Sequence, residues 1–277
     1  MRIPRPFLCA LLVLCFFVGP SHAKKWPGRA GGDSASGDPE LLLTFDDGPH
    51  ERNTGKILDT LEEYGHQAIF FWTGHRVLHD RRGKEERLAV IDRAVSSGHL
   101  VGNHTISHAK LCSVSRDQAE HEIDEGGRLF EGLTNLPMIL FRVPYGARCK
   151  RLDKMLVERD LTHLHWDLDP QEFRHHDVKT TVRYVTSRLR RLENGQRAVL
   201  LMHDTQPAAA KALPKILVWI ESENEKRAKL GRRPIRVIEA SSWVAENHSL
   251  PLFEWGHSSM LAGGLALRSA ATKLLPR

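Results

Sequence analysis

The sequence predicts an α/β fold in which parallel strands alternate with crossover helices. Short apolar runs of strand length recur along the chain, and amphipathic stretches with helical periodicity separate them. About seven such units follow one another, and that number in one domain favours a barrel over an open sheet. No internal repeat is visible.

Each predicted strand is an apolar run bounded by turn or helix signals. The first run ends at the sequence Asp-Asp-Gly-Pro, which is typical of a turn. The sixth run, residues 198–202, is apolar throughout and predicts a buried strand. The expected strands cover residues 41–45, 68–72, 100–102, 138–141, 162–168, 198–202 and 235–238.

Helices are expected between the strands because apolar residues recur there at helical spacing. In the first helix Ile57 and Leu61 share one face, and Gly65 offers a C-terminal cap. Ser115 with Gln118 predicts a capping box for the third helix. The expected helices cover residues 54–64 and 85–97, run from 115 towards 130, pass through 152–156, extend from a cap at 177 to near 195, and pass through 217–220.

Composition and charge are those of an ordinary globular protein. Apolar residues make up 41% and charged residues 27% of the 277 residues. The net charge of +6 is too small and too scattered to predict a nucleic-acid partner. No pattern in the sequence indicates an oligomeric state.

The first 23 residues have the organisation of a secretory signal peptide. Arg2 and Arg5 precede an apolar run at residues 7–18, and small residues suited to cleavage follow at 21–23. An uncleaved membrane anchor is the alternative, but this run is shorter than the roughly 20 residues that a membrane span needs. We therefore expect export to the periplasm, the cell envelope or the extracellular space, with no transmembrane span after cleavage.

The rest of the chain divides into three parts. Residues 24–39 are rich in Gly, Ser, Asp and Pro and predict a flexible leader. Residues 40–247 contain all the predicted strands and form the expected folded domain. Residues 248–277 are a C-terminal tail whose pattern predicts neither a docked nor a membrane-surface segment.

Two cysteines remain after the predicted cleavage, Cys112 and Cys149. In an oxidising compartment they could form a disulfide, and two buried free thiols are the alternative. Both follow polar motifs at the ends of neighbouring predicted strands. We therefore expect their Cα atoms to lie within the roughly 7 Å that a disulfide allows.

Five separate segments place ionisable residues directly after predicted strands. They are Asp46 with Asp47, His104 with His108, Arg142, Asp169 with Glu172, and His203 with Asp204. The carboxyl ends of parallel strands meet at one rim of a sheet or barrel. These side chains are therefore expected to converge on a single site.

His104 and His108 are spaced so that on a helical turn they face the same way. Together with one carboxylate they would form a three-ligand site with a position open for water. That donor set suits zinc, and cobalt, nickel or manganese less specifically. The pair alone is weak evidence, because the chain has 16 histidines.

Asp46 and Asp47 can divide two roles, because one acid can bind a metal while its neighbour accepts a proton. Arg142 beside a carboxylate would lower the pKa of that carboxylate and hold it in place. His203, kept protonated by an acid, could donate to a leaving group. The structural alternatives are solvated turn acids, a surface ion pair and a core histidine.

Taken in order, these segments resemble the five motifs of the polysaccharide deacetylases, the NodB-homology domain or carbohydrate esterase family 4. The matching segments are TFDDGP at 44–49, HTISH at 104–108, RVPY at 142–145, DPQEF at 169–173 and LMH at 201–203. The resemblance extends from about residue 41 to 238. It implies a distorted (β/α) barrel and a deacetylase catalytic domain over residues 40–247.

The resemblance also implies a reaction. Asp47, His104 and His108 would bind one divalent metal ion, and Asp46 would act as the general base, steadied by Arg142. The substrate would be an acetylated carbohydrate polymer or oligomer. The implied activity is hydrolysis of N-acetyl groups in an N-acetylglucosamine-containing polymer such as peptidoglycan or a chitin-like glycan.

The last three motifs complete the implied site. The backbone amide of Tyr145 would stabilise the oxyanion, His203 would be the general acid, and Leu201 would line the acetyl pocket. The fourth motif departs from the family, which usually has Asp-Trp where this chain has Glu172-Phe173. The side chain of Glu is one methylene longer than that of Asp, so we expect its carboxylate to contact Arg142 or His203 from a different position. Phe keeps an aromatic wall for the substrate without the indole donor.

Two other functions remain open. An O-acetyl esterase acting on a xylan-type polymer would use the same groups, so the motifs do not separate it from an N-deacetylase. A sugar-binding protein on an inactive scaffold is a second alternative. Asp46 and His203 argue against it, because a binding module needs neither proton-transfer residue.

Overall fold

The structure, a computed structural model, describes residues 32–78 and 82–247. The predicted signal peptide, the first part of the predicted leader and the predicted tail lie outside the described residues. The strands are β1 (Glu40–Asp46), β2 (Ile69–Trp72), β3 (Leu100–Asn103), β4 (Leu140–Phe141), β5 (Thr162–His163), β6 (Arg197–His203) and β7 (Arg236–Val237). Within the described residues, no helix is both long enough and apolar enough to cross a membrane.

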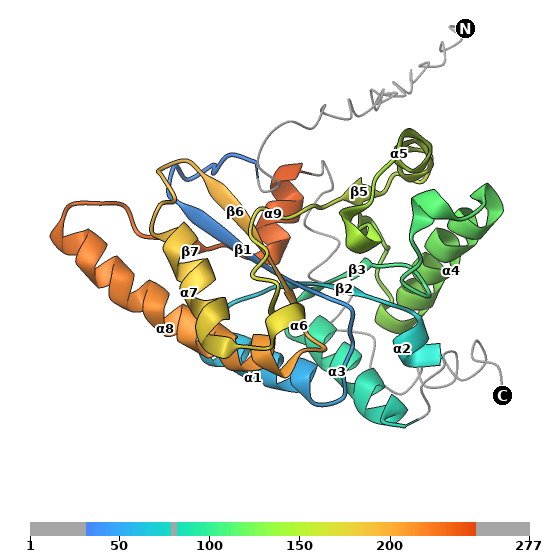
Figure 1. The fold of residues 1–277 in the computed structure, drawn as a ribbon, viewed down its shortest axis with the longest axis horizontal. Helices are drawn as coiled ribbons and strands as arrows, with labels where there is room; N and C mark the ends of the chain where they lie inside the picture. Colours follow the sequence, from blue (N-terminus) through green and yellow to red (C-terminus); the bar gives the residue numbers. More distant parts are fainter. Residues whose placement is uncertain (1–31, 79–81, 248–277) are drawn as a thin grey trace, which may run out of the picture.

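Helices follow most of the strands, as expected for crossover connections. They are α1 (Asn53–Glu63), α2 (His75–Leu78), α3 (Lys84–Ser96), α4 (Arg116–Thr134), α5 (Lys150–Val157), α6 (Glu172–His175), α7 (Val178–Leu189), α8 (Pro207–Lys229) and α9 (Ala240–Asn247). Single 3₁₀ turns occur at η1 (Leu111–Ser113) and η2 (Pro144–Gly146). Figure 1 shows α1, α7 and α8 at one end of the sheet and α4 and α5 at the other.

The strands pair in parallel in the order β5-β4-β3-β2-β1-β6, and β7 pairs with the start of β1. Across the sheet Asp46 is in register with Phe71 on one side and with His203 on the other. The two residues expected to transfer protons therefore end adjacent strands. The parallel arrangement brings the other motif segments to the same rim.

Alternation along β1 separates two cores. Leu41, Leu43 and Phe45 belong to the cluster packed against the outer helices, whereas Leu42 packs with the inner cluster that includes Trp243 of α9. Side chains of a strand point alternately to opposite faces, so Asp46 lies on the same inner face as Leu42. The interior of the barrel is thus lined by apolar side chains, and ionisable side chains lie at its rim.

The segment after β5 closes the sheet. Backbone N–H groups of Asp167 and Leu168 donate to Val199 O at 2.9 and 3.0 Å, and Leu201 N–H donates to Leu168 O at 2.9 Å. The outermost strands in the pairing order are thereby tied together. The sheet curls into a distorted barrel, which confirms the predicted fold class.

Several element boundaries differ from the predictions. The strand expected at 162–168 ends at His163, because the chain leaves β4 after Leu164 and bonds to β6 at residues 167 and 168. The strand expected at 138–141 begins at Leu140, because Ile139 N–H bonds to Pro137 O in a turn. Helix α7 ends at Leu189 rather than near 195, and turn hydrogen bonds follow it. The short helices α2 and α6 and the helix α9 were not predicted.

Candidate active site

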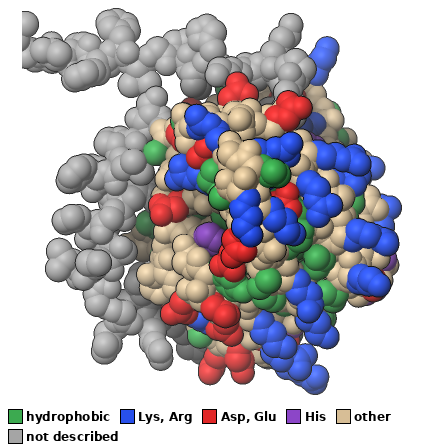
Figure 2. All heavy atoms as spheres, turned by 90° about the vertical axis from the view of Figure 1, so that its left-hand side faces the viewer, with side chains coloured by type: hydrophobic (Ala, Val, Ile, Leu, Met, Phe, Trp, Pro, Cys, Tyr) green, Lys and Arg blue, Asp and Glu red, His purple; other side chains and the backbone are tan. Residues whose placement is uncertain are grey.

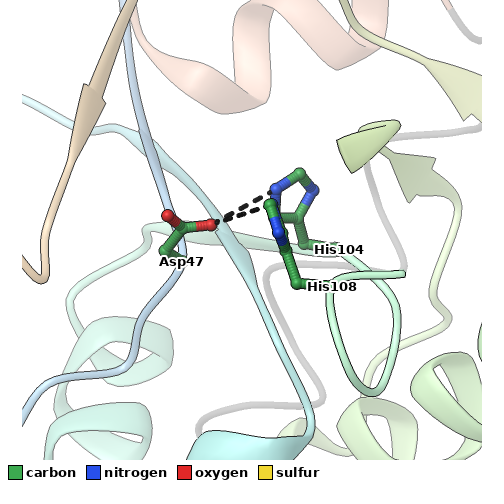
Figure 3. A group of neighbouring side chains, drawn as sticks. All are labelled: Asp47, His104 and His108. Atoms are coloured by element: carbon green, nitrogen blue, oxygen red, sulfur yellow. Dashed lines mark ion pairs between the residues drawn. The ribbon is translucent and has the colours of Figure 1, made fainter. Parts of the chain in front are cut away.

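Asp47, His104 and His108 come together at the rim (Figure 3). The Nε2 atoms of His104 and His108 lie 3.5 and 3.3 Å from Asp47 Oδ1. One ligand atom from each of the three residues lies within 4.8 Å of the others. The two imidazoles and the carboxylate thus face one point from two separate loops.

The loop that carries the two histidines is not helical, so the expected helical turn is wrong. Thr105 and His108 have φ values of 72° and 61°. Asn103 Oδ1 accepts from Thr105 N–H at 2.8 Å, and Thr105 Oγ1 accepts from His108 N–H at 3.0 Å. A Cβ at Gly126 of α4 would lie 2.4 Å from Asn103 Oδ1, so α4 can support this loop closely only with glycine at that position.

The three residues fit a divalent metal ion. Ligand atoms placed tetrahedrally about 2.1 Å from an ion lie about 3.4 Å apart, close to the measured separations. Asp47 Oδ1 is buried and has no hydrogen-bond partner among the described residues. His104 Nδ1 lies 2.7 Å from Arg142 O, so this nitrogen carries the proton and Nε2 presents its lone pair. Burial lowers the pKa of His108, which favours the neutral imidazole that a metal requires.

Asp46 lies beside this group and is held by Arg142. The guanidinium is fully buried, and its Nη1 donates to Asp46 Oδ1 at 2.8 Å and to Thr44 Oγ1 at 2.7 Å. Its Nε donates to Leu164 O at 2.8 Å, and the group lies 4.2 Å from the centre of the Phe71 ring. The other carboxylate oxygen, Asp46 Oδ2, is 3.7 Å from His104 Nε2. One oxygen is therefore anchored, and the other lies beside His104, one of the three ligand residues.

His203 ends β6 and bonds to Glu172 of α6. Glu172 Oε1 accepts from the His203 backbone N–H at 2.6 Å and lies 3.0 Å from His203 Nδ1. Burial by itself lowers the pKa of His203, but the hydrogen bond and charge of Glu172 outweigh burial and raise the pKa to about 9. His203 is thus protonated at neutral pH. Since Nδ1 is engaged, Nε2 remains for proton transfer.

The longer side chain of Glu172 supports the histidine and not the arginine. Glu172 is completely buried, and the Phe173 ring packs edge-on against His203 with centroids 4.7 Å apart. The unpredicted helix α6 explains this placement, because it turns the fourth motif back towards the end of β6.

Tyr145 and Leu201 also border the site. Tyr145 lies in η2 with φ 60° and is 66% exposed, and its ring meets that of His108 edge-on at 4.5 Å. Leu201 is buried on the strand that carries His203, two residues earlier, so both side chains lie on the same face.

Cys112 and Cys149 form a disulfide with a Cα–Cα distance of 6.1 Å. Cys112 follows His108 by four residues, and Cys149 follows Tyr145 by four residues. The bond therefore joins the loops of the second and third motifs.

The role of Asp204 was not predicted from the sequence, which places this residue only at the rim. Asp204 is completely buried and accepts hydrogen bonds from Thr54 Oγ1 at 2.6 Å and Trp72 Nε1 at 2.9 Å. A Cβ at Gly48 would lie 2.1 Å from Asp204 Oδ2, so glycine is required in the turn that follows Asp47. Burial raises the pKa of Asp204 to about 7. The adjacency of Asp204 to His203 was the available signal, but adjacency alone does not predict burial.

Comparisons with known proteins show which proteins this chain resembles. A family model described as polysaccharide deacetylase matches residues 33–163. The chain is 30% identical over 175 residues to a chitooligosaccharide deacetylase of Rhizobium leguminosarum bv. trifolii. This match covers 63% of the chain and 76% of that protein. It is also 30% identical over 177 residues to the peptidoglycan-N-acetylmuramic acid deacetylase PdaC of Bacillus subtilis, and this match covers 64% of the chain and 35% of PdaC.

The chain thus spans about a third of the length of PdaC. The solved structure of the peptidoglycan deacetylase PdaC from Bacillus subtilis superposes with a TM-score of 0.62 at 25% identity, covering 76% of this chain and 93% of that one. The chain belongs to the polysaccharide deacetylase family. The family predicted from the sequence is thus confirmed.

Proposed function

We propose that the protein is a metal-dependent deacetylase that hydrolyses N-acetyl groups of an N-acetylglucosamine-containing polymer such as peptidoglycan or a chitin-like glycan. The observation that carries the proposal is the arrangement of the three ligand groups. Asp47 Oδ1 lies 3.3 Å from His108 Nε2 and 3.5 Å from His104 Nε2. The Asp46–Arg142 and His203–Glu172 pairs border this arrangement. The similarity of the chain to peptidoglycan and chitooligosaccharide deacetylases supports this substrate class.

Each residue has a proposed part in the reaction. Asp47, His104 and His108 would hold the ion, zinc suiting this donor set best and cobalt, nickel or manganese less specifically. When bound, the ion supplies Lewis-acid polarisation of the acetyl carbonyl and a more acidic water. Asp46, anchored by Arg142, accepts the proton of the attacking water.

The remaining groups stabilise charge and release the product. The backbone N–H of Tyr145 donates to the developing oxyanion. His203 protonates the departing nitrogen through Nε2 while Glu172 holds Nδ1. Leu201 and Phe173 supply the apolar walls beside the acetyl group and the sugar.

An O-acetyl esterase is the second candidate. It would use the same ligands and the same base, but an alcohol leaves more readily than an amine. The strong engagement of His203 by Glu172 favours the amide reaction, because an amine must be protonated as it leaves. A binding protein on an inactive scaffold is disfavoured, because both proton-transfer pairs are intact.

We further propose that the protein acts outside the cytoplasm. The disulfide between Cys112 and Cys149 supports this location, because structural disulfides persist in oxidising compartments.

Acetate release from N-acetylated chito-oligomers, peptidoglycan and acetylated xylan tests the proposal. The protein should release acetate from the N-acetyl substrates, lose this activity after chelation and regain it when a divalent metal is returned. Metal content should fall in Asp47→Ala, with Asp59→Ala on α1 as the matched control. Release from acetylated xylan alone would favour the esterase, and normal metal content in Asp47→Ala would refute the ligand assignment.

A further inference from the structure

A basic groove lies between α7 and α8, outside the catalytic residues. Its volume is about 740 Å³. Its cations are Lys179, Arg183 and Arg190 from the α7 side and Lys215 from α8, and apolar Val178 and Val182 also line it. Figure 2 faces this end of the molecule and shows Lys and Arg side chains over much of the surface.

The positive charge of the basic groove is only partly compensated, because Asp177 interacts electrostatically with Arg183 and Glu223 lies near Arg190. Lys179, Arg183 and Lys215 have no carboxylate within 4.0 Å among the residues that the structure describes. Arg190 approaches Glu223 only to 3.9 Å. The acidic residue in the lining, Asp177, accepts a hydrogen bond from Thr180 N–H as the cap of α7.

Some surface arginines elsewhere in the molecule are paired with acidic residues, whereas Arg191 and Arg232 have no carboxylate within 4.0 Å among the described residues. Arg93 bonds to Asp59 and Glu62, and Arg159 bonds to Asp124, at 2.5 to 2.7 Å. Helix α7 itself contains three cationic residues and no acidic one. A cluster of cations in a hollow raises the local concentration of anionic ligands. The basic groove is therefore built to receive negative charge.

The position of the groove connects it to the active site. Helix α6, which carries Glu172 and Phe173, contacts both α7 and α8. Helix α7 begins six residues after Glu172, and α8 begins four residues after His203. Both helices therefore start at the catalytic rim and run away from it. The cations from residue 179 to 190 extend about 16 Å along α7, which suits a stretch of polymer.

We propose that the basic groove binds a carboxylate-bearing segment of the same glycan strand whose acetyl groups the active site removes. The inference rests on the proposed function and deepens it by naming an acidic glycan as substrate class. The cations pair with carboxylates repeated along the strand. Val178 and Val182 pack against the apolar faces of the sugar rings. Binding in the groove positions the strand so that an N-acetyl group beyond the segment reaches His203.

Binding of two forms of one polymer tests the inference. The probes are glycan strands of peptidoglycan freed of peptides, which carry lactyl carboxylates, and the same strands after amidation of those carboxylates. Wild-type protein should bind the charged form about tenfold more tightly at low salt, and the preference should shrink as salt screens the charges. Arg183→Ala/Lys215→Ala should bind the charged form roughly five- to tenfold more weakly than wild type, with unchanged binding of the amidated form.

Two further variants control for folding and for net charge. Arg183→Lys/Lys215→Arg keeps both charges and should keep the preference. Arg128→Ala on α4 with Lys154→Ala on α5 removes two cations at the other end of the molecule and should bind as wild type does. Thermal unfolding of all variants shows whether the Ala variant is folded.

The inference is overturned if wild type binds both polymer forms equally, or if the distant control variant loses the preference as fully as the groove variant. It is also overturned if the groove variant loses binding to polyphosphate or to anionic phospholipid vesicles but not to the carboxylated strands. Acetate release by wild type from a short uncharged oligomer tests the proposed function separately. Its absence, with charge-dependent binding intact, would refute the activity and leave the groove assignment standing.

Discussion

Replacing Glu172 with Gln should move the alkaline limit of activity to lower pH. Gln keeps the size of the side chain and an oxygen that can accept from the His203 backbone N–H, but it loses the charge. His203 must be protonated to act as a general acid, and its pKa of about 9 keeps it so at neutral pH. Burial alone lowers that pKa, so the elevated value depends chiefly on Glu172.

The size of the effect follows from the pKa. Without the Glu172 carboxylate the pKa of His203 should fall from about 9 towards its ordinary value of 6.5, because only the charges of Asp47 and Asp46 then oppose the effect of burial. A difference of this size corresponds to roughly 3 kcal/mol of interaction with the protonated ring. Because the folded pKa is raised, this stabilisation is fully present below pH 6.5 and is lost as pH rises through about 9. The variant should therefore lose more stability at pH 6 than at pH 10.

The assay is kcat/KM for acetate release from an N-acetyl oligomer between pH 5 and 10, with wild type and variant both loaded with the same metal. The alkaline limit of the variant profile should lie well below that of the wild-type profile, because Glu172 is the main group that raises the pKa of His203. An activated acetyl ester, whose leaving group needs no proton, should show no such alkaline limb in either protein. A variant profile that still falls near pH 9 would refute the assignment of Glu172 as the group that keeps His203 protonated.

Three further predictions concern the base, the acid and the disulfide. Asp46→Asn should keep its metal but lose about 10²–10⁴-fold in turnover, and a normal rate would exclude Asp46 as the base. His203→Ala should also keep its metal and slow N-acetyl substrates far more than an activated ester, whereas equal losses would make it a binding residue. Cys112→Ser/Cys149→Ser should lower the free energy of unfolding by about 3–4 kcal/mol, since the bond spans 37 residues, and should lower turnover because it joins the two motif loops. An unchanged melting temperature with unchanged turnover would contradict that role.

The sequence predicted those parts of the fold that depend on local patterns. The long apolar runs became β1 and β6, and the capping box of Ser115 and Gln118 forms as expected. The short strands were less predictable, because β4, β5 and β7 have only two residues each and are defined by their neighbours. Closure through residues 167 and 168 depends on hydrogen bonds to β6, about 30 residues further along the chain, which no local pattern encodes.

The candidate site was more predictable than the conformations that build it. Residues at strand ends must share a rim, so the convergence of Asp47, His104 and His108 follows from topology. The loop that carries the histidines has positive φ at Thr105 and His108, and positive φ is uncommon for residues other than glycine. The direction of Glu172 depended on α6, a single turn of helix whose position is set by contacts with α7 and α8.

Three buried acidic residues near the rim have different hydrogen-bond partners. These partners indicate a different role for each residue. Asp46 meets the guanidinium of Arg142, and Glu172 meets the imidazole of His203. Asp204 instead meets neutral donors, a hydroxyl and an indole, and these do not offset the cost of burying its charge, so its pKa rises to about 7. It also packs against Gly48, beside the turn that orients Asp47. Without a cation to hold it ionised, Asp204 is suited to anchoring that turn, and this supports our proposal that Asp46 is the acid that accepts the proton.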